Sequence, residues 1–101
     1  MATNGMRPIH PGEILREEFL GPLDITPAAL ARALRVSAPT INDIARERRG
    51  ITADIAIRLG RYFDTSAQFW MNLQMEYALA TAYAEVGEEI EHEIEPLLAT
   101  A

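Results

Sequence analysis

Residues 26–49 read TPAALARALRVSAPTINDIARERR, and this stretch decides the fold. Thr26 and Ser37 each precede a short segment with helical spacing of apolar residues, and a hydroxyl in that position accepts a hydrogen bond from the first turn of a helix. A tight connection, Arg35-Val36-Ser37, separates the two segments. The apolar side chains able to form one shared core are Leu30, Leu34, Val36, Ile41 and Ile44. We therefore predict two short helices packed against each other.

This pair of segments is typical of a helix-turn-helix unit. Ala31 lies where the two helices would cross, and its small side chain allows the backbones to approach closely. In such a unit the second helix lies in the major groove of DNA, while the first crosses the sugar–phosphate backbone. The stretch therefore predicts DNA binding.

The candidate DNA-contacting residues lie on the outward face of the second helix and directly after it. They are Ser37, Ala38, Pro39, Thr40, Asn42, Asp43, Arg46, Arg48 and Arg49. Apolar Ala38 and Pro39 suit thymine methyl groups, and Asn42 suits adenine. Asp43 suits the amino group of cytosine. The hydroxyls at the start of the helix and the arginines beyond its end are placed to bind phosphate oxygens.

Each of these roles has an alternative that needs no DNA. Ser37, and the similar helix-start residues Thr26 and Thr52, would serve purely as helix caps. Asp43 would form an ion pair with Arg46, three residues further along the same helix. The three arginines would be a solvated turn. These alternatives stay open from the sequence.

Further start and stop signals extend the helical pattern over the whole chain. Pro11 opens a first segment, which Gly21-Pro22 is expected to stop. Later segments begin after Thr52, Ser66 and Gly87. The sequence shows no alternation of the kind that strands have. The prediction is an all-α fold, a compact bundle of five to six helices.

The composition bounds the class of protein. The chain has 101 residues, of which 49% are apolar and 24% charged, and this balance fits one globular domain. It has no cysteine, which excludes disulfides, thiol catalysis and cysteine zinc sites. No apolar run is long enough to span a membrane, and the start MATNGM does not look like a signal peptide. We expect a cytoplasmic protein with no membrane partner.

The charge is divided unevenly along the chain. Residues 1–64 carry all nine arginines against eight acidic residues, a net charge of +1, whereas residues 65–101 carry seven glutamates and no cation, a net charge of −7. We therefore divide the single domain 1–101 into a helix-turn-helix core at 7–64 and C-terminal helices at 65–101 that dimerise or bind a partner. The alternative is that the glutamates only solubilise the last helix.

The segment after Asp64 is too apolar for one helix face. One stripe consists of Trp70, Leu73, Tyr77 and Ala80, and a second consists of Phe69, Leu79, Tyr83 and Val86. We expect one stripe to cover the domain and the other to contact a second subunit, unless all of them belong to the monomer core. The predicted dimerisation residues are Phe69, Trp70, Leu73, Tyr77, Leu79 and Tyr83.

Three stretches carry a resemblance to a known family. They are HPGEILREEFL at 10–20, TPAALARALRVSAPTINDI at 26–44 and RRGITADIAIRLGRYFDTSAQFWMNLQ at 48–74. They resemble the phage-repressor (XRE) type of helix-turn-helix domain. More narrowly, they resemble the HigA/VapI-type antitoxins of bacterial toxin–antitoxin systems.

The resemblance implies a lambda-repressor-like bundle and a type II antitoxin that represses its own operon by binding a palindromic operator as a homodimer. It also implies a partner, a basic HigB-type mRNA-interferase toxin, which the antitoxin neutralises. Two features depart from the family pattern. Arg35 stands where the turn often has glycine, at a cost of roughly 1 kcal/mol if the backbone there is left-handed. Ala38 and Pro39 stand where polar amides are frequent, so they offer no side-chain donors to bases.

The sequence holds no convincing catalytic or metal-binding pattern. His92 lies between Glu91 and Glu93, which point to different faces of a helix, and His10 has no nucleophile beside it and more simply starts the first helix. We expect no enzymatic activity, no metal and no cofactor. Two other functions stay open. One is a helix-turn-helix transcription regulator without a cognate toxin, and the other is an interaction adaptor that has lost DNA binding.

Overall fold

The computed structural model describes residues 7–98, and all regular structure in that range is helical. An N-terminal stretch consists of α1 (Pro11–Ile14), the π-helical η1 (Leu15–Leu20) and α2 (Gly21–Leu23). Three separate helices follow, α3 (Pro27–Leu34), α4 (Ala38–Ala45) and α5 (Ala53–Phe63). A last stretch consists of α6 (Ala67–Ala82), the π-helical η2 (Tyr83–Gly87) and α7 (Glu88–Glu93). The predicted all-α helix-turn-helix fold is confirmed.

The helix starts follow the predicted capping residues. The side chains of Thr26, Ser37, Thr52 and Ser66 each accept a hydrogen bond from the backbone N–H three residues later, at 3.1, 3.3, 3.3 and 2.9 Å. His10 starts α1 in a similar way, because its Nδ1 accepts a hydrogen bond of 2.8 Å from the first turn. A cap contributes about 1 kcal/mol, so local chemistry fixes where these helices begin.

The predicted stop of the first helix at Gly21-Pro22 is wrong by one or two residues. The helix continues to Leu23, and the chain leaves it at Asp24, which is left-handed with φ 56°. The turns before the proline are π-helical, and the N–H of Gly21 bonds to the carbonyl of Arg16, five residues back. Such a widened turn relieves the clash that a proline ring normally makes with the preceding turn, so Pro22 does not end the helix.

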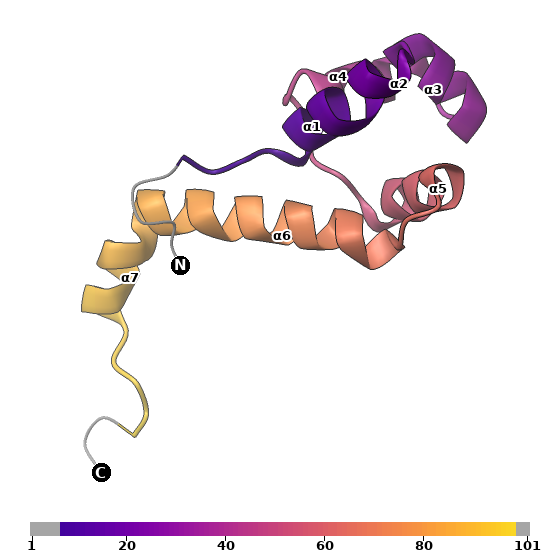
Figure 1. Cartoon of the computed structure of the whole chain (residues 1–101). Helices are drawn as coiled ribbons and strands as arrows, with labels where there is room; N and C mark the ends of the chain where they lie inside the picture. Colours follow the sequence, from indigo (N-terminus) through magenta and orange to yellow (C-terminus); the bar gives the residue numbers. More distant parts are fainter. Residues whose placement is uncertain (1–6, 99–101) are drawn as a thin grey trace.

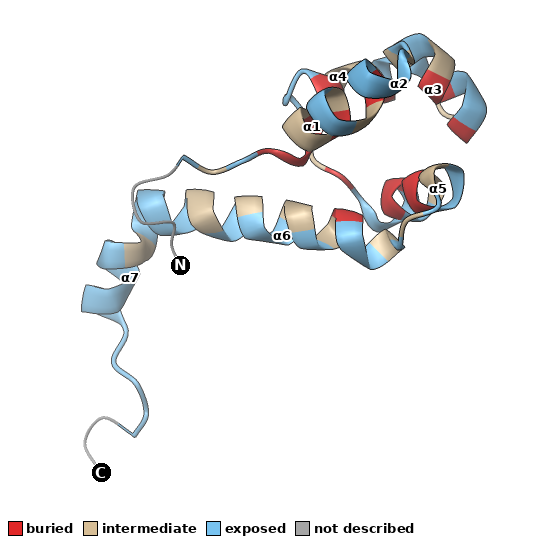
Figure 2. Ribbon diagram, viewed as in Figure 1, coloured by how far each residue is buried: buried red, intermediate tan, exposed pale blue. Residues whose placement is uncertain are grey.

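The helix-turn-helix unit is built around the predicted shared core. The buried side chains on α3 and α4 are Leu30, Ala31, Leu34, Ile41, Ile44 and Ala45. Val36 in the turn packs against them, and α5 adds Ile55, Ala56 and Leu59 (Figure 2). Fully burying a leucine or isoleucine side chain contributes about 1.5–3 kcal/mol, so these residues dominate the stability of the unit.

The core extends past residue 64 into the first turns of α6. Trp70 has no exposed surface, its ring centroid lies 5.0 Å from that of Phe19, and its indole N–H donates to the hydroxyl of Thr65 at 2.8 Å. Beyond this anchor, α6 runs away from the bundle, and α7 turns off at its far end (Figure 1). We call residues 75–93 the C-terminal arm. The molecule measures 56 × 23 × 21 Å, so a compact bundle carries a projecting arm. No helix in the described range is long and apolar enough to cross a membrane.

Candidate nucleic-acid interface

Helix α4 exposes the predicted contact residues at its N-terminal end. The exposed residues there are Ser37, Ala38 and Pro39. Thr40 and Asn42 are half-buried, whereas the isoleucines on the inner face of the helix are fully buried. The Ser37 hydroxyl lies 2.7 Å from that of Thr40, so a pair of hydroxyls marks the start of the helix. This face therefore offers apolar groups, hydroxyls and one amide, a mixture able to contact both base edges and phosphates in a major groove.

The turn before α4 is tight and left-handed. Arg35 has φ 62° and ψ 43°. The N–H groups of Arg35 and Val36 donate to the carbonyls of Arg32 at 3.2 Å and Ala31 at 3.0 Å, the hydrogen-bond pattern of a Schellman motif. The left-handed backbone that makes a non-glycine residue costly here is therefore present. These paired bonds fix how α3 leads into α4.

We call residues 46–50, which follow α4, the arginine loop. Its first turn closes on the helix, because Glu47 is left-handed with φ 64° and the N–H of Arg48 donates to the carbonyl of Asp43 at 2.7 Å. The loop thus turns back, and the Asp43 carboxylate lies 3.5 Å from the Arg49 guanidinium. The pair expected as an alternative, Asp43 with Arg46, is replaced by this one. Arg46 and Arg48 are exposed and form no ion pair within residues 7–98.

Arg16, which the sequence did not single out, holds the end of α4. Its guanidinium donates to the carbonyl of Ala45 and lies 3.2 Å from the carboxylate of Glu47 in the arginine loop. Hydrogen bonds to Glu17 and Glu47 raise the pKa of Arg16 above its ordinary value. The contact joins residues that are 29 positions apart, so no local sequence pattern reveals it.

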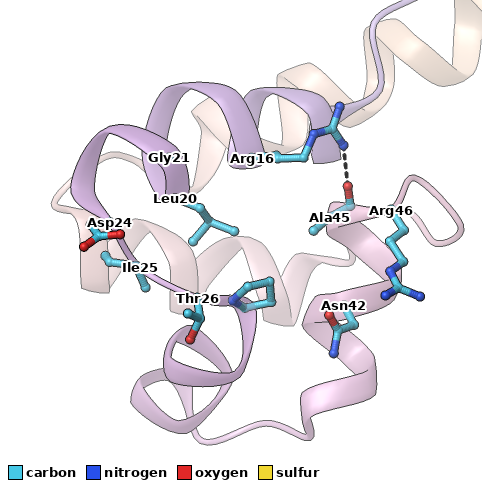
Figure 3. A pocket seen from close by; sticks show the side chains of 10 residues that line it. Arg16, Leu20, Gly21, Asp24, Ile25, Thr26, Asn42, Ala45 and Arg46 are labelled. Atoms are coloured by element: carbon cyan, nitrogen blue, oxygen red, sulfur yellow. Dashed lines mark hydrogen bonds between the residues drawn. The ribbon is translucent and has the colours of Figure 1, made fainter.

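An open pocket of about 590 Å³ lies between η1, the start of α3 and the end of α4. Figure 3 shows Asn42 and Arg46 on one side of it, Asp24 and Thr26 on the other, and Arg16 at the rim. The pocket therefore joins the start of one helix to two guanidinium groups, an arrangement that favours a phosphate oxygen. Among the described residues, no cluster of acidic and histidine side chains has the composition of a metal site.

His10 ties the N-terminal helix to α6. Its side chain is 4% exposed, and its ring meets the ring of Tyr77 edge-on with centroids 4.7 Å apart. Burial lowers the pKa of His10 below its ordinary value of 6.5, while Glu47 raises it and Arg16 lowers it by smaller amounts. The neutral ring accepts the hydrogen bond from Gly12, whereas a protonated ring has no acceptor left.

The two apolar stripes of α6 have different surroundings. The first stripe covers the domain, with Trp70 buried and Leu73, Tyr77 and Ala80 half-buried. Trp70 is therefore a core residue rather than a contact for a second subunit, because no surface of it is left free. Phe69 is 37% exposed and rests against the ring of Trp70. The other predicted members of the second stripe, Leu79, Tyr83 and Val86, are exposed, and two further exposed residues, Met75 and Ile90, extend this apolar surface along α6 and into α7. These five residues, which are 39–69% exposed, are Met75, Leu79, Tyr83, Val86 and Ile90. We call these five residues the exposed stripe.

Helix α7 is acidic and lies at the far end of the C-terminal arm (Figure 1). Its exposed glutamates form no ion pair within the described range, and they are Glu88, Glu89, Glu91 and Glu93. In the N-terminal helix, by contrast, Glu13 pairs with Arg7 at 2.8 Å and Glu17 pairs with Arg16 at 3.1 Å. Uncompensated negative charge is therefore concentrated at the end of the arm.

Related proteins match most of the chain. The pattern of the helix-turn-helix family matches residues 15–70. Antitoxin HigA of Pseudomonas aeruginosa, solved with the higBA promoter, is 82% identical with a TM-score of 0.89, and the match covers 91% of this chain and 100% of that one. Antitoxin GraA, solved in complex with its operator, is 52% identical with a TM-score of 0.89 over 98% of this chain and 100% of that one. Virulence-associated protein I of Dichelobacter nodosus is 58% identical over 79 residues, which are 78% of this chain and 73% of that protein.

Proposed function

This chain belongs to the HigA/VapI-type antitoxins of the helix-turn-helix family, and we propose that it represses its own operon by binding a palindromic operator as a homodimer and that it neutralises a basic ribonuclease toxin. The observation that carries the proposal is the surface of α4 and the arginine loop. It combines an exposed, capped helix start with two arginines free of ion pairs within residues 7–98. A chain 82% identical was solved with promoter DNA, which supports DNA binding by this chain.

In the proposed complex, the exposed end of α4 enters the major groove. Ala38 and Pro39 contact thymine methyl groups, and the amide of Asn42 binds adenine. Arg46 and Arg48 bind phosphate oxygens on either side of the groove, and phosphate contacts of this kind supply most of the sequence-independent affinity. Asp43 keeps Arg49 close to the helix through their ion pair, so Arg49 approaches the DNA from a defined direction.

Dimerisation supplies the second half of the interface. One helix-turn-helix unit contacts one half-site, and a two-fold axis places two recognition helices about 34 Å apart on a palindrome. The exposed stripe is the surface we assign to this contact, because its five large apolar side chains remain 39–69% exposed within the described chain. A second copy would cover them by packing the two arms together.

The toxin is the partner we assign to α7. Its four glutamates are exposed and make no ion pair with described residues, whereas in the rival N-terminal helix Glu13 and Glu17 are paired and only Glu18 is exposed without an ion pair to a described residue. An acidic surface attracts a basic protein and raises the association rate more than the final affinity. It also lies away from α4, where its repulsion of phosphate is screened over about 8 Å at physiological salt.

The test of DNA binding uses the full chain and the DNA upstream of its own gene. We expect tight binding to that duplex and weak, strongly salt-dependent binding to a shuffled duplex of equal length. Asn42→Ala is expected to lose about 1–3 kcal/mol of discrimination between the two duplexes while affinity for the shuffled one stays. Equal affinity of the wild-type chain for both duplexes would rule out operator recognition.

The toxin assignment needs a separate test. Co-purification with the product of the adjacent gene is expected, and its absence favours a transcription regulator without a toxin. Reversing Glu88, Glu89, Glu91 and Glu93 to lysine should slow toxin association and remove its salt dependence while operator binding persists. Toxin association that is unchanged in this variant would place the contact elsewhere, with the N-terminal helix as the next candidate.

A further inference from the structure

A side chain of α6 holds the end of the arginine loop. The Oε1 of Gln74 accepts a hydrogen bond of 2.6 Å from the backbone N–H of Ile51, which is 23 residues earlier in the chain. Ile51 is buried and Gln74 is half-buried, so the bond lies in a protected place. The fit is close, because a Cβ atom added to Gly50 would lie only 2.7 Å from the same oxygen.

The arginine loop is therefore held at both ends by different parts of the fold. At its start, the left-handed turn at Glu47 and the guanidinium of Arg16 fix it to the end of α4. At its end, Gln74 accepts a hydrogen bond from the backbone N–H of Ile51, the residue that leads into α5. The candidate phosphate ligands of the loop lie between these two attachments. Their side chains are exposed, so the path of the backbone determines the positions from which the arginine side chains extend toward the phosphates.

Helix α6 carries Gln74 on the same face as Trp70 and Tyr77, which pack against the rest of the fold. Trp70 anchors it in the core, Tyr77 contacts His10, and the exposed stripe starts at Met75 on its other side. The hydrogen bond that Gln74 accepts from Ile51 therefore connects the helix assigned to dimerisation directly with the end of the loop assigned to phosphate.

We propose that Gln74 is a positioning residue for DNA binding, whose amide oxygen sets the path of residues 46–51 and so the approach of Arg46 and Arg48 to the phosphates. This role rests on the proposed function, since it acts through the DNA contacts assigned above. Gln74 itself needs no contact with DNA. Its removal is expected to weaken phosphate binding by the loop while leaving base preference at Asn42 in place.

The first experiment compares Gln74→Met with a matched control, Gln68→Met. Gln68 lies on the same helix, is exposed, and bonds only to Asn72 at 2.8 Å among the described residues. For Gln74→Met we expect faster hydrogen exchange at the Ile51 amide and a smaller log–log salt slope of DNA binding, by about 0.9 for each phosphate that the variant no longer binds. Gln68→Met is expected to keep the wild-type slope. The slope is measured on the folded protein at low temperature, so a reduced thermal stability alone does not move it.

The second experiment tests the same hydrogen bond with a substitution in the loop. Gly50→Ala places a methyl group against the Gln74 oxygen and is expected to weaken DNA binding in the wild-type chain. In a Gln74→Ala background the methyl group has room, so the same substitution should have little effect. If Gly50→Ala lowers the affinity for DNA equally in both backgrounds, the proposal is overturned. It is also overturned if Gln74→Met shows faster exchange of the Ile51 amide but keeps the wild-type salt slope. If the wild-type chain binds neither operator nor shuffled DNA, the proposed function itself fails, and the role of Gln74 falls with it.

Discussion

The helix-turn-helix core and the C-terminal arm use apolar residues in opposite ways. In the core, the leucines and isoleucines of α3, α4 and α5 are buried, with the exception of Ile57, and most arginines are exposed. In the arm, Leu79, Tyr83 and Ile90 are exposed and glutamates stand between them. Both regions are helical, but the core helices α3, α4 and α5 start at side-chain caps, whereas η2 and α7 of the arm have none. The core thus buries most of its apolar residues within one chain, whereas the arm leaves them exposed, and this contrast is the basis of the dimer contact proposed for the arm.

The sharpest contrast is between two aromatic residues of the same helical stretch, one in each region. Trp70→Ala removes a fully buried ring and is expected to destabilise the fold by about 3–5 kcal/mol. Tyr83→Ala removes a ring that is 69% exposed, so the isolated subunit should keep its stability while self-association weakens. Urea unfolding at low protein concentration measures the first effect, and sedimentation at high concentration measures the second. Equal destabilisation by the two substitutions at low concentration would erase the distinction between core and arm.

A second prediction compares an arginine of the core that is assigned to DNA phosphates with one that is not. Arg46→Ala should weaken binding to operator and shuffled DNA alike, by roughly 1.5–3 kcal/mol for the charged hydrogen bond it removes, and lower the log–log salt slope by about 0.9 per site. Arg61→Ala, on an exposed position near the end of α5, is the control and should change neither. Fluorescence anisotropy over a range of salt concentrations gives both quantities. An unchanged slope in Arg46→Ala would remove this residue from the interface.

The helix-turn-helix unit is predictable from local signals, whereas the fate of the aromatic residues on α6 is not. The caps at Thr26 and Ser37 and the apolar spacing of α3 and α4 lie within short stretches of sequence, so they predict that unit well. The helix α6 is apolar on more than one face, so periodicity alone does not separate Trp70 in the core from Tyr83 on the surface. Only the packed neighbours of α6 distinguish them.

The contacts that position the residues of the candidate site are the hardest to predict from the sequence. Arg16 with Ala45 and Gln74 with Ile51 join residues 29 and 23 positions apart, and no short motif encodes such pairs. The pairing of Asp43 with Arg49 depends on the left-handed turn at Glu47, which brings the loop back to the helix. Helical spacing alone favours Arg46 as the partner of Asp43.

A smaller effect is expected from pH at the junction of the two regions. The pKa of His10 is lowered by burial, so the folded chain binds fewer protons than the unfolded chain just below pH 6.5. Stability is therefore complete above that pH and falls as the solution becomes more acidic, through the window between 6.5 and the lower folded value. The size of the loss follows from the lowering of the His10 pKa, whose main cause is burial of the ring. Thermal unfolding of wild type and His10→Asn over this range checks it, and a midpoint that falls equally in both proteins would assign the effect to other groups.

The smallest expected effect concerns the left-handed turn of the core. Arg35→Gly relieves the steric cost at φ 62° but adds freedom to the unfolded chain, so we expect a gain of about 0.5 kcal/mol. The C-terminal arm should not respond, and self-association should stay as in wild type. Urea unfolding detects the gain, while a loss of stability would show that the Arg35 side chain makes a contact worth more than the backbone cost.

The central claim is that two helix-turn-helix cores are joined through their arms on one operator. The most direct measurement is the stoichiometry of the complex with the DNA upstream of the gene, by sedimentation velocity, for the wild-type chain and for Leu79→Asp in the exposed stripe. We expect two chains per operator for wild type. For Leu79→Asp we expect a folded monomer, which loses tight operator binding but keeps weak, salt-dependent binding to any duplex. A wild-type chain that stays monomeric and binds the operator as one subunit, or a Leu79→Asp variant that dimerises and binds as tightly as wild type, would contradict the claim.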